Sequence, residues 1–378
     1  MAEHAEAFFA QSYAEARAKF LAAAEAAGLD VESRAHPLLG REGEALALDV
    51  LRQGPARGRA ERLLILSSAC HGVEGFAGSG IQCGLLADPQ WLAAVRASGV
   101  CVLYLHGLNP HGFSWWRRVT QEGVDLNRNF VDFHQRPLPA NPGYEELASA
   151  LLPRQWPPSA ENEARLSDYI ARHGRAAWQQ AVSGGQYTQE LGLFYGGHTP
   201  TWSHITLRHV LEEHLVGVRE LAWIDLHTGL GPCGHGERIY TGQDTGESLA
   251  RARQWWGAGV TSLSEGNSSS APLVGLMWSI VEPVFAQVAP GARYTGMALE
   301  FGTVPLDEMI LALRADHWLE AHPEAPPEQV LAIKRQIRDA FYIDTPAWKA
   351  QLLAQASEAA HQALAGLNSG SPLSSSPT

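Results

Sequence analysis

The amino-acid sequence predicts an α/β fold, a single domain with one mixed, mostly parallel β-sheet flanked by helices. Two short apolar runs, at residues 62–69 and 99–105, enclose a helical stretch, and this β-α-β pattern favours parallel pairing. Two further apolar runs, at 220–226 and 296–301, supply two more strands. The chain has 378 residues, enough to bury a large core, and shows neither an internal repeat nor a strong linker.

The elements before and between these strands follow from hydrophobic spacing and from turn residues. Aromatic and apolar side chains recur at helical spacing over 6–28, and Gly28 is a typical helix end. A short alternating stretch at 44–51 predicts another strand. The helix of the β-α-β unit is expected over about 80–98, with an interruption near Pro89.

The later elements are predicted in the same way. The polar, proline-rich stretch at 113–158 indicates irregular structure, and a serine- and glycine-rich loop is expected at 262–270. Helices are expected over residues 161–182, 201–217, 247–257, 326–342 and 346–365. We expect the folded domain to comprise residues 1–366 and the serine-, proline- and glycine-rich tail, 367–378, to be disordered.

Composition and charge exclude several classes of protein. The chain carries 28 Lys and Arg against 40 Asp and Glu, a net charge of −12, which argues against a nucleic-acid partner. The apolar runs are too short for a membrane span, and the first residues lack the basic region of a signal peptide. The four cysteines have no CxxC spacing and read as reduced thiols, so we expect a cytoplasmic protein.

Ionisable residues follow three of the predicted strands directly. His71 and Glu74 come after the first apolar run, Asp225 and His227 end the third, and Glu300 ends the fourth. The carboxyl ends of parallel strands meet at one edge of a sheet, where ligand sites form. Two imidazoles and two glutamates are the donor set of a catalytic zinc site, with an open position for water and a spare carboxylate.

Each of these residues alone also has a purely structural interpretation. His71 and Glu74 could cap the following helix, His227 could be a satisfied core histidine, and Glu300 could pair with an arginine. Asp225 shares a strand face with His227, so it either orients that histidine or caps a neighbouring loop. Their combination at one sheet edge favours a site.

A second histidine pair serves as a counterexample. His209 and His214 lie in a predicted helix, where five residues turn the two side chains about 140° apart, so they cannot easily share a metal ion. We interpret this pair as part of a solvated helix face.

Three further motifs lie between the first and third strand ends: Asn-Pro-His-Gly at 109–112, Trp-Arg-Arg at 116–118, and Gly-Val-Asp-Leu-Asn-Arg-Asn-Phe at 123–130. In this order and spacing the chain resembles the zinc carboxypeptidase superfamily, the carboxypeptidase A-like metallopeptidases that are related to succinylglutamate desuccinylase and aspartoacylase. The resemblance extends from His71 to Gly302, and the Asp-Leu-His-Thr-Gly-Leu-Gly string that starts at Asp225 is similar to a bacterial branch of the superfamily.

The resemblance implies a zinc carboxypeptidase-like catalytic domain with a phosphorylase/hydrolase-like fold and one Zn²⁺ per chain. His71, Glu74 and His227 would hold the metal, which lowers the pKa of bound water toward about 7 and polarises the scissile carbonyl. Glu300 would take the proton of the water and pass it to the leaving amine. A second metal stays open, because the nearby motifs also contain His106, His111 and Asp125.

The resemblance also implies how a substrate is held. Arg117 would stabilise the developing oxyanion, with the adjacent Arg118 as the alternative. Asn127 and Arg128 would bind the terminal carboxylate of the substrate, with the arginine as a bidentate partner. Surface ion pairing is the structural alternative for these arginines, and a local turn is the alternative for Asn127.

The chain departs from the superfamily at several points. His111 stands where the superfamily often has Asp, and neither Tyr240 nor Tyr294 fits the usual place of the mobile tyrosine. The residue that sets side-chain specificity cannot be located. The long segment 137–197 either covers the active site or forms a packed surface excursion.

Three functions remain in competition. The first is a zinc carboxypeptidase that acts on a small peptide. The second is an N-acyl amino acid deacylase with the same site. The third is a non-catalytic binding protein on the same fold, and the intact set of ligand residues disfavours this third function. A serine hydrolase is disfavoured because the sequence has no Gly-x-Ser-x-Gly elbow. The expected partner is therefore a peptide or an N-acyl amino acid, with no nucleic acid and no membrane, and the oligomeric state stays open.

Overall fold

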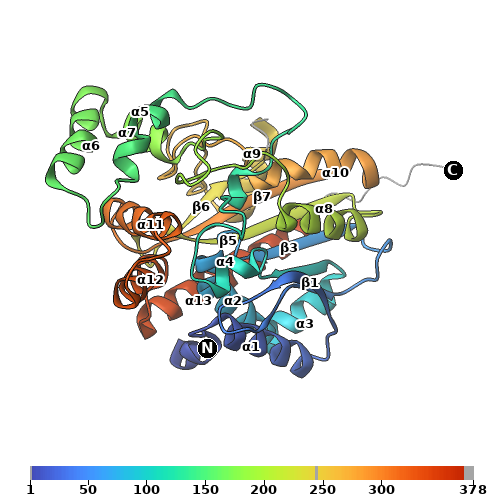
Figure 1. Cartoon of the computed structure of the whole chain (residues 1–378). Helices are drawn as coiled ribbons and strands as arrows, with labels where there is room; N and C mark the ends of the chain where they lie inside the picture. Colours follow the sequence, from blue (N-terminus) through green and yellow to red (C-terminus); the bar gives the residue numbers. More distant parts are fainter. Residues whose placement is uncertain (1, 243–245, 370–378) are drawn as a thin grey trace.

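The computed structural model describes residues 2–242 and 246–369 (Figure 1). Seven strands form one sheet in the order β1-β2-β4-β3-β5-β7-β6. The four central strands, β4, β3, β5 and β7, run parallel, whereas β1, β2 and β6 are antiparallel to their neighbours. The strands are β1 (Val31–Leu39), β2 (Ala45–Gln53), β3 (Arg62–Ser68), β4 (Cys101–His106), β5 (Glu220–Cys233), β6 (Gly236–Tyr240) and β7 (Arg293–Gly302). The predicted mixed, mostly parallel sheet is confirmed.

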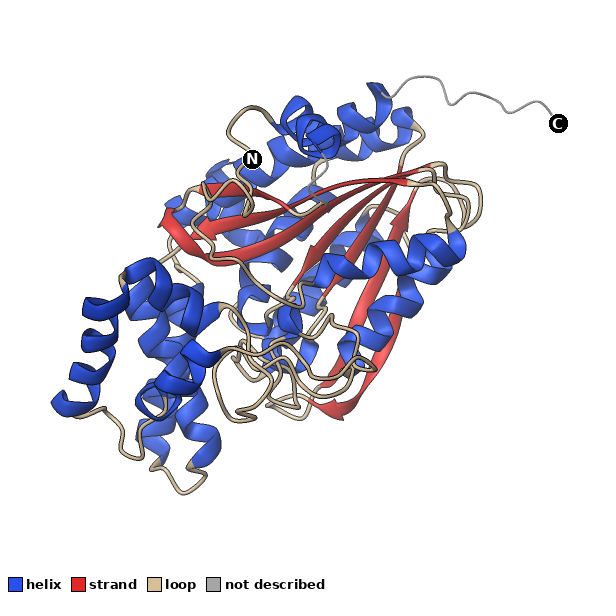
Figure 2. Ribbon diagram, turned by 90° about the horizontal axis from the view of Figure 1, so that it is seen from above, coloured by secondary structure: helices blue, strands red, loops and turns tan. Residues whose placement is uncertain are grey.

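Helices cover both faces of this sheet, because its central strands are apolar on both sides (Figure 2). Along β3, Leu64 and Leu66 pack into one core cluster, and Leu63 and Ile65 pack into the other. The first face is covered by α1 (Tyr13–Ala26), α2 (Gly75–Leu86), α3 (Pro89–Ser98), α9 (Gly246–Trp256) and α13 (Pro346–Ser369). The second face is covered by α8 (Trp202–His214) and α10 (Val281–Val288).

A third group of helices packs beside the sheet rather than across it (Figure 2). It consists of α5 (Pro142–Leu151), α6 (Ala160–His173), α7 (Arg175–Ser183), α11 (Leu306–Ala321) and α12 (Pro327–Phe341). Short helical pieces complete the fold: η1 (Ala2–Phe8), η2 (Gly72–Glu74), α4 (Pro110–Ser114), η3 (Leu126–Arg128) and η4 (Met277–Ile280). Because η2, α4 and η3 follow the central strands, they shape the edge at which the strands end.

Two predicted helices are each divided in two. The interruption predicted near Pro89 is confirmed, because Asp88 caps α3 by accepting from the Gln90 backbone N–H, although α2 begins at Gly75, before the expected residue 80. The helix expected over 161–182 breaks at Gly174, whose φ of +86° ends α6. Helix α5 lies in the stretch that was predicted to be irregular.

Strands β1 and β6 and helices α10 and α11 were not predicted at all. Strands β1 and β6 lie at the two edges of the sheet, and β1 is mostly exposed, so it lacks the alternating pattern of a half-buried strand. Helix α11 is buried on nearly all sides between Met309 and Leu319, so it shows no amphipathic period.

The end of the chain differs from the prediction as well. Helix α13 runs to Ser369, so residues 367–369 are helical instead of belonging to a tail, and residues 370–378 lie outside the described part. Among the described residues, no helix has the length and apolar character that a membrane crossing requires.

Candidate metal centre and substrate pocket

The three predicted metal ligands lie together at the carboxyl edge of the sheet. His71 follows β3, Glu74 ends η2, and His227 lies on β5 opposite Glu300 of β7. One ligand atom from each of His71, Glu74 and His227 lies within 4.8 Å of the others, and all three side chains are buried. The Glu74 carboxylate lies between the two imidazoles, 2.8 Å from His71 Nδ1 and 3.0 Å from His227 Nδ1. Both Nδ1 atoms therefore face the same carboxylate.

The second nitrogen of each imidazole meets another carboxylate. His227 Nε2 lies 2.5 Å from Asp225 Oδ2, and His71 Nε2 lies 3.2 Å from Asp125 Oδ1. The Ser67 hydroxyl donates to the other oxygen of Asp225 at 2.5 Å. The Asp225 carboxylate holds the proton on His227 Nε2 and leaves Nδ1 free to bind a metal ion. His71 Nε2 also lies 2.7 Å from Arg118 Nη2, so Arg118 and Asp125, which the sequence offered only for a second metal, together orient the His71 ring.

These residues fit a divalent cation. Tetrahedral zinc with bonds of about 2.1 Å separates neighbouring ligand atoms by about 3.4 Å, close to the 2.8 and 3.0 Å observed here. The cluster also has an excess of negative charge. When both imidazoles are neutral, as metal binding requires, four carboxyl groups meet two guanidinium groups, those of Arg118 and Arg128, and a doubly charged cation would offset the difference.

The ionisation of the cluster follows from burial and from these contacts. Burial alone would raise the pKa of Glu74, but the imidazoles of His71 and His227 hold it well below its usual range. Burial would lower the pKa of His227, but the Asp225 carboxylate raises it well above its usual range. Burial and the charge of Glu74 raise the pKa of Glu300 to about 7, so this carboxyl group can exchange a proton near neutral pH.

The two consecutive arginines point to different places. Arg118 lines the pocket and donates to Glu74 at 3.0 Å and to Asp125 at 2.9 Å. Arg117 instead binds Asp316 at 3.1 Å and Glu320 at 2.9 Å, both on α11. Arg117, the first choice for the oxyanion role, therefore does not line the pocket, whereas the alternative, Arg118, does. Neighbouring side chains diverge from the backbone, and the sequence does not indicate which of the two faces the metal centre.

Asn127 and Arg128 line the same pocket. The Asn127 side-chain oxygen accepts from the Met277 backbone N–H at 2.7 Å, which leaves its NH₂ group to meet a ligand. Arg128 donates to the Ser183 carbonyl at 3.2 and 2.8 Å and to the Asn127 carbonyl at 2.8 Å. Within the described residues these bonds use three of the five guanidinium N–H groups, so two can bind an anion.

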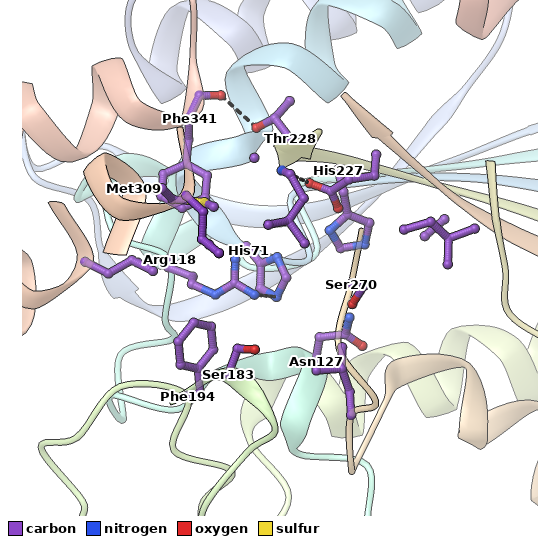
Figure 3. A pocket seen from close by; sticks show the side chains of 18 of the residues that line it. His71, Arg118, Asn127, Ser183, Phe194, His227, Thr228, Ser270, Met309 and Phe341 are labelled. Atoms are coloured by element: carbon purple, nitrogen blue, oxygen red, sulfur yellow. Dashed lines mark hydrogen bonds between the residues drawn. The ribbon is translucent and has the colours of Figure 1, made fainter. Parts of the chain in front are cut away.

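The loop between α7 and α8 forms part of the pocket wall. Its Phe194 ring lies 5.3 Å from the Arg118 guanidinium carbon and 5.4 Å from that of Arg128 (Figure 3). The segment 137–197 thus contributes to the site through Phe194 and Ser183. Phe194 has a φ of +54°, a conformation that is rare for an aromatic residue. Ala69 and Trp116, each two residues before a site residue, share this left-handed conformation, and such strain concentrates at functional sites.

Several other residues singled out in the sequence lie elsewhere. His106 contacts Ser79 at 2.9 Å, and His111 stacks on Trp115 at 5.7 Å. Neither ring belongs to the ligand cluster, so of the three residues named for a second metal only Asp125 reaches the site. Tyr294 bonds to Thr241 and does not line the pocket.

The second histidine pair behaves differently from the expectation. His209 is exposed, but His214 is buried, with one ring nitrogen 3.2 Å from Arg52 and the other 3.0 Å from Arg57. Both neighbours are cations, so this histidine belongs to a group of ion pairs and not to a solvated face. Glu213 in the same group binds arginine as well, which disfavours a metal ion there.

The fold and site define the class of this protein: an α/β protein with a buried His-Glu-His cluster and a further glutamate, Glu300, beside it at the carboxyl edge of its sheet. The chain belongs to the family described as Protein of unknown function (DUF2817), whose model matches residues 9–355. A search of curated protein sequences finds no match.

Solved structures with a similar chain path come from the groups that the sequence motifs resemble. One is a provisionally assigned metallopeptidase from Shewanella amazonensis SB2B, with 17% identity, a TM-score of 0.41 and coverage of 82% of this chain and 92% of that chain. Carboxypeptidase A from Helicoverpa armigera has 14% identity, a TM-score of 0.44 and coverage of 87% and 74%. A provisionally assigned succinylglutamate desuccinylase/aspartoacylase from Shewanella frigidimarina has 16% identity, a TM-score of 0.34 and coverage of 72% and 64%.

Proposed function

We propose that this protein is a zinc-dependent amide hydrolase, a carboxypeptidase that acts on a small peptide with a free C-terminal carboxylate. The observation that carries this proposal is the cluster of His71, Glu74 and His227 with Glu300 beside it at the same sheet edge. A structural ion cluster would have no use for a glutamate poised to exchange a proton near neutral pH.

The chain would perform the reaction at the scissile bond with three kinds of group. His71, Glu74 and His227 would hold a zinc ion, which would supply Lewis-acid chemistry toward the water and the scissile carbonyl. Glu300 takes a proton from the attacking water and delivers it to the leaving amine, and its carboxylate is positioned by the Leu230 backbone N–H at 2.9 Å. Arg118, anchored by two carboxylates, faces the developing oxyanion.

The carboxylate of the substrate would be bound by Arg128 and Asn127. Arg128 is buried and held by carbonyl groups, so its free N–H groups are already oriented before a ligand arrives. An N-acyl amino acid presents the same carboxylate at the same distance from its amide bond as a dipeptide does. A deacylase therefore uses this end of the site in the same way, and a substrate screen has to include both classes.

The metal and the general base are tested together. We expect about one zinc per chain in the purified protein, as in other sites with three protein ligands, and loss of the metal in His71→Ala. Glu300→Gln should retain zinc and lower hydrolysis of the best peptide or acyl amino acid by about 10²–10⁴-fold. Elemental analysis and steady-state kinetics measure the two quantities. A protein that takes up no metal, or a fully active Glu300→Gln variant, contradicts the proposal and favours a binding protein.

The carboxylate assignment has its own test. Arg128→Ala should lower kcat/KM for substrates with a free carboxylate far more than for their C-terminal amides, because only the former form the charge-assisted contact. Arg175→Ala removes an exposed arginine that pairs with Asp307 and serves as the matched control. Equal losses on both substrate types would show that Arg128 supports the pocket without binding the carboxylate.

A further inference from the structure

One side of the pocket is a continuous apolar wall. Helix α11 supplies most of it, and Leu230 and the last residue of α12 complete it. We call the following six side chains the α11 wall: Leu230, Leu306, Met309, Ile310, Leu313 and Phe341. In Figure 3, Met309 and Phe341 lie on one side of His71, next to Arg118, and Asn127 and Ser270 lie on the other. The wall thus belongs to the Arg118 end of the pocket.

The α11 wall begins directly beside the general base. A Cβ atom added to Gly229 would lie 3.3 Å from Glu300 Oε1, 3.0 Å from Met309 Sδ and 3.4 Å from Phe341 Cε1. Gly229 also has a φ of +149°, which disfavours other residues. The glycine therefore lets Glu300 and two side chains of the wall approach the same point of the backbone closely. A group that packs on this end of the wall lies beside the Glu300 carboxylate.

The wall is held in place before any ligand binds. The Thr228 hydroxyl, one residue after His227, donates to the Phe341 carbonyl at 2.7 Å (Figure 3). The Thr303 hydroxyl donates to the Ala340 carbonyl at 2.7 Å. These bonds fix the end of α12 to the strands that carry the site. A preformed apolar surface retains more of its binding energy than a mobile one, because less side-chain entropy is lost.

None of the six side chains of the α11 wall carries a charge. Among the described residues that line the pocket, the cationic groups besides the imidazoles are Arg118 and Arg128. Both lie next to the Phe194 ring, and Arg118 is paired with Glu74 and Asp125. Asp307 and Glu308 in the first turn of α11 are exposed outside the pocket, and Asp307 is paired with Arg175. A carboxylate placed against the wall would be buried without a partner, which is strongly unfavourable.

We infer that the substrate carries an uncharged, apolar group on the acyl side of the scissile amide, and that this group packs on the α11 wall. The inference rests on the proposed function, which places the amino-acid carboxylate at Arg128 and the scissile carbonyl at Arg118. The acyl group then extends past Glu300 toward Met309 and Phe341. Branched aliphatic and aromatic acyl or aminoacyl groups fit this wall, whereas succinyl and aspartyl groups do not.

Two pairs of nearly isosteric substrates test the inference. The 4-methylpentanoyl and succinyl derivatives of one amino acid differ only in an isopropyl group against a carboxylate. The N-acetyl-leucyl and N-acetyl-aspartyl derivatives make the same comparison for a peptidase. We expect kcat/KM of the zinc-loaded protein to be at least ten-fold higher for the apolar member of whichever pair is cleaved. Calorimetric titration of the zinc-loaded Glu300→Gln variant should give the same order of affinity without turnover.

A charge placed on the wall should change this preference. Leu306 is half-buried at the start of α11, so Leu306→Arg adds a cation at the rim with little risk to the core. This variant should lower the ratio of apolar to acidic substrate by at least ten-fold. Leu331→Arg adds the same charge at an exposed leucine of α12 outside this pocket and should leave the ratio unchanged. Leu313→Ala shortens one side chain of the wall and so enlarges the pocket, which should shift the preference toward bulkier acyl groups.

The outcomes separate this inference from the proposed function. Cleavage of the succinyl or aspartyl compound as fast as its apolar partner, with zinc bound, overturns the apolar subsite and leaves the hydrolase intact. An unchanged ratio in Leu306→Arg, in a variant that is folded and zinc-loaded, also overturns it. Zinc-loaded protein that neither cleaves nor binds any of the four compounds contradicts both. A ten-fold preference that Leu306→Arg abolishes supports both.

Discussion

The neighbouring residues Arg118 and Arg117 belong to two different buried ionic clusters. Arg118 lies at the candidate metal centre, and Arg117 lies in a cluster between α11 and α12. In the α11–α12 cluster, Asp316 accepts from Arg117 at 3.1 Å and from Lys334 at 2.6 Å, and Arg117 also meets Glu320. Its two cations and two carboxylates balance. The metal centre retains an excess of carboxylates, and its two Nδ1 atoms converge on one of them. A balanced cluster is complete without a ligand, whereas the unbalanced one has a place for a cation.

The pKa values of one carboxyl group from each cluster, Asp316 and Glu300, show the same contrast between a balanced and an unbalanced cluster. Burial alone would raise the pKa of Asp316, but Lys334 and Arg117 hold it at about 2. Burial and a neighbouring carboxylate raise the pKa of Glu300 to about 7. The first group stays charged throughout the physiological range, and the second can change its charge there. The comparison separates a carboxylate that supports the structure from one suited to chemistry.

The clusters are also connected. The carbonyl of Arg117 accepts from the Val73 backbone N–H at 2.8 Å, and the carbonyl of Arg118 accepts from Gly72 at 3.1 Å. A Cβ atom on Gly72 would lie 2.1 Å from the backbone of Gly112, so only glycine permits this close approach. The turn that carries His71 and Glu74 therefore lies directly on the loop that the α11–α12 cluster holds.

The largest expected effect comes from breaking the balanced cluster. Asp316→Asn leaves Arg117 and Lys334 without their shared buried carboxylate, and such a loss destabilises a protein by about 3–5 kcal/mol. Urea unfolding of the zinc-loaded protein measures the change. Glu320→Gln removes a carboxylate that is 43% exposed and should lower stability by less than about 1 kcal/mol. Equal effects of the two variants would show that burial does not distinguish the two carboxylates.

The two arginines provide the next contrast. Arg118→Ala should lower kcat by about 10²–10³-fold, the usual loss for a donor to an oxyanion. Arg117→Ala should mainly lower the free energy of unfolding, and the folded fraction should keep a kcat within a few-fold of the original. Kinetics corrected for the folded, zinc-loaded fraction separate the effects. A larger loss of kcat in Arg117→Ala than in Arg118→Ala would reverse the assignment of the oxyanion.

Metal binding should stabilise the protein through the cluster of His71, Glu74 and His227 and not through the group around His214. At a free zinc concentration of 100 times Kd, we expect the free energy of unfolding to rise by about 3 kcal/mol. His227→Ala should abolish most of this rise, whereas His214→Ala, in the arginine-rich group, should preserve it. Thermal unfolding with and without chelator measures the shift. A comparable loss in both histidine variants would place the metal elsewhere.

A smaller effect on the free energy of unfolding is expected when a third buried carboxylate, that of Asp49, becomes protonated at low pH. Burial would raise the pKa of Asp49, but the nearby His106 ring, whose Nδ1 lies 3.8 Å away, and the hydrogen bonds from Arg17 lower it to about 2. Its stabilising contribution is therefore complete above the unfolded-state pKa, near 3.9, and is lost as the pH falls toward 2. We expect a contribution of about 2 kcal/mol at neutral pH. Asp49→Asn should flatten the acid limb of the stability curve between pH 4 and pH 2, and an unchanged limb would contradict this account.

The meeting of the candidate metal ligands could be predicted because its signals are local. His71, His227 and Glu300 each stand at the end of an apolar run, and parallel strands bring such ends together by their geometry. The central strands themselves are continuous apolar runs, which is the pattern of a sheet buried on both faces. The sequence by itself therefore determined the mixed sheet and the residues that meet at its edge.

Only the tertiary structure decided which side chains surround that edge. Arg117 and Arg118 are chemically identical, and their roles depend on Asp316, almost 200 residues away in the chain. The α11 wall was invisible in the sequence because α11 is buried on nearly all sides, which removes the hydrophobic period that marks a helix. Such features depend on contacts between distant segments, and local sequence patterns do not encode the partner of a side chain.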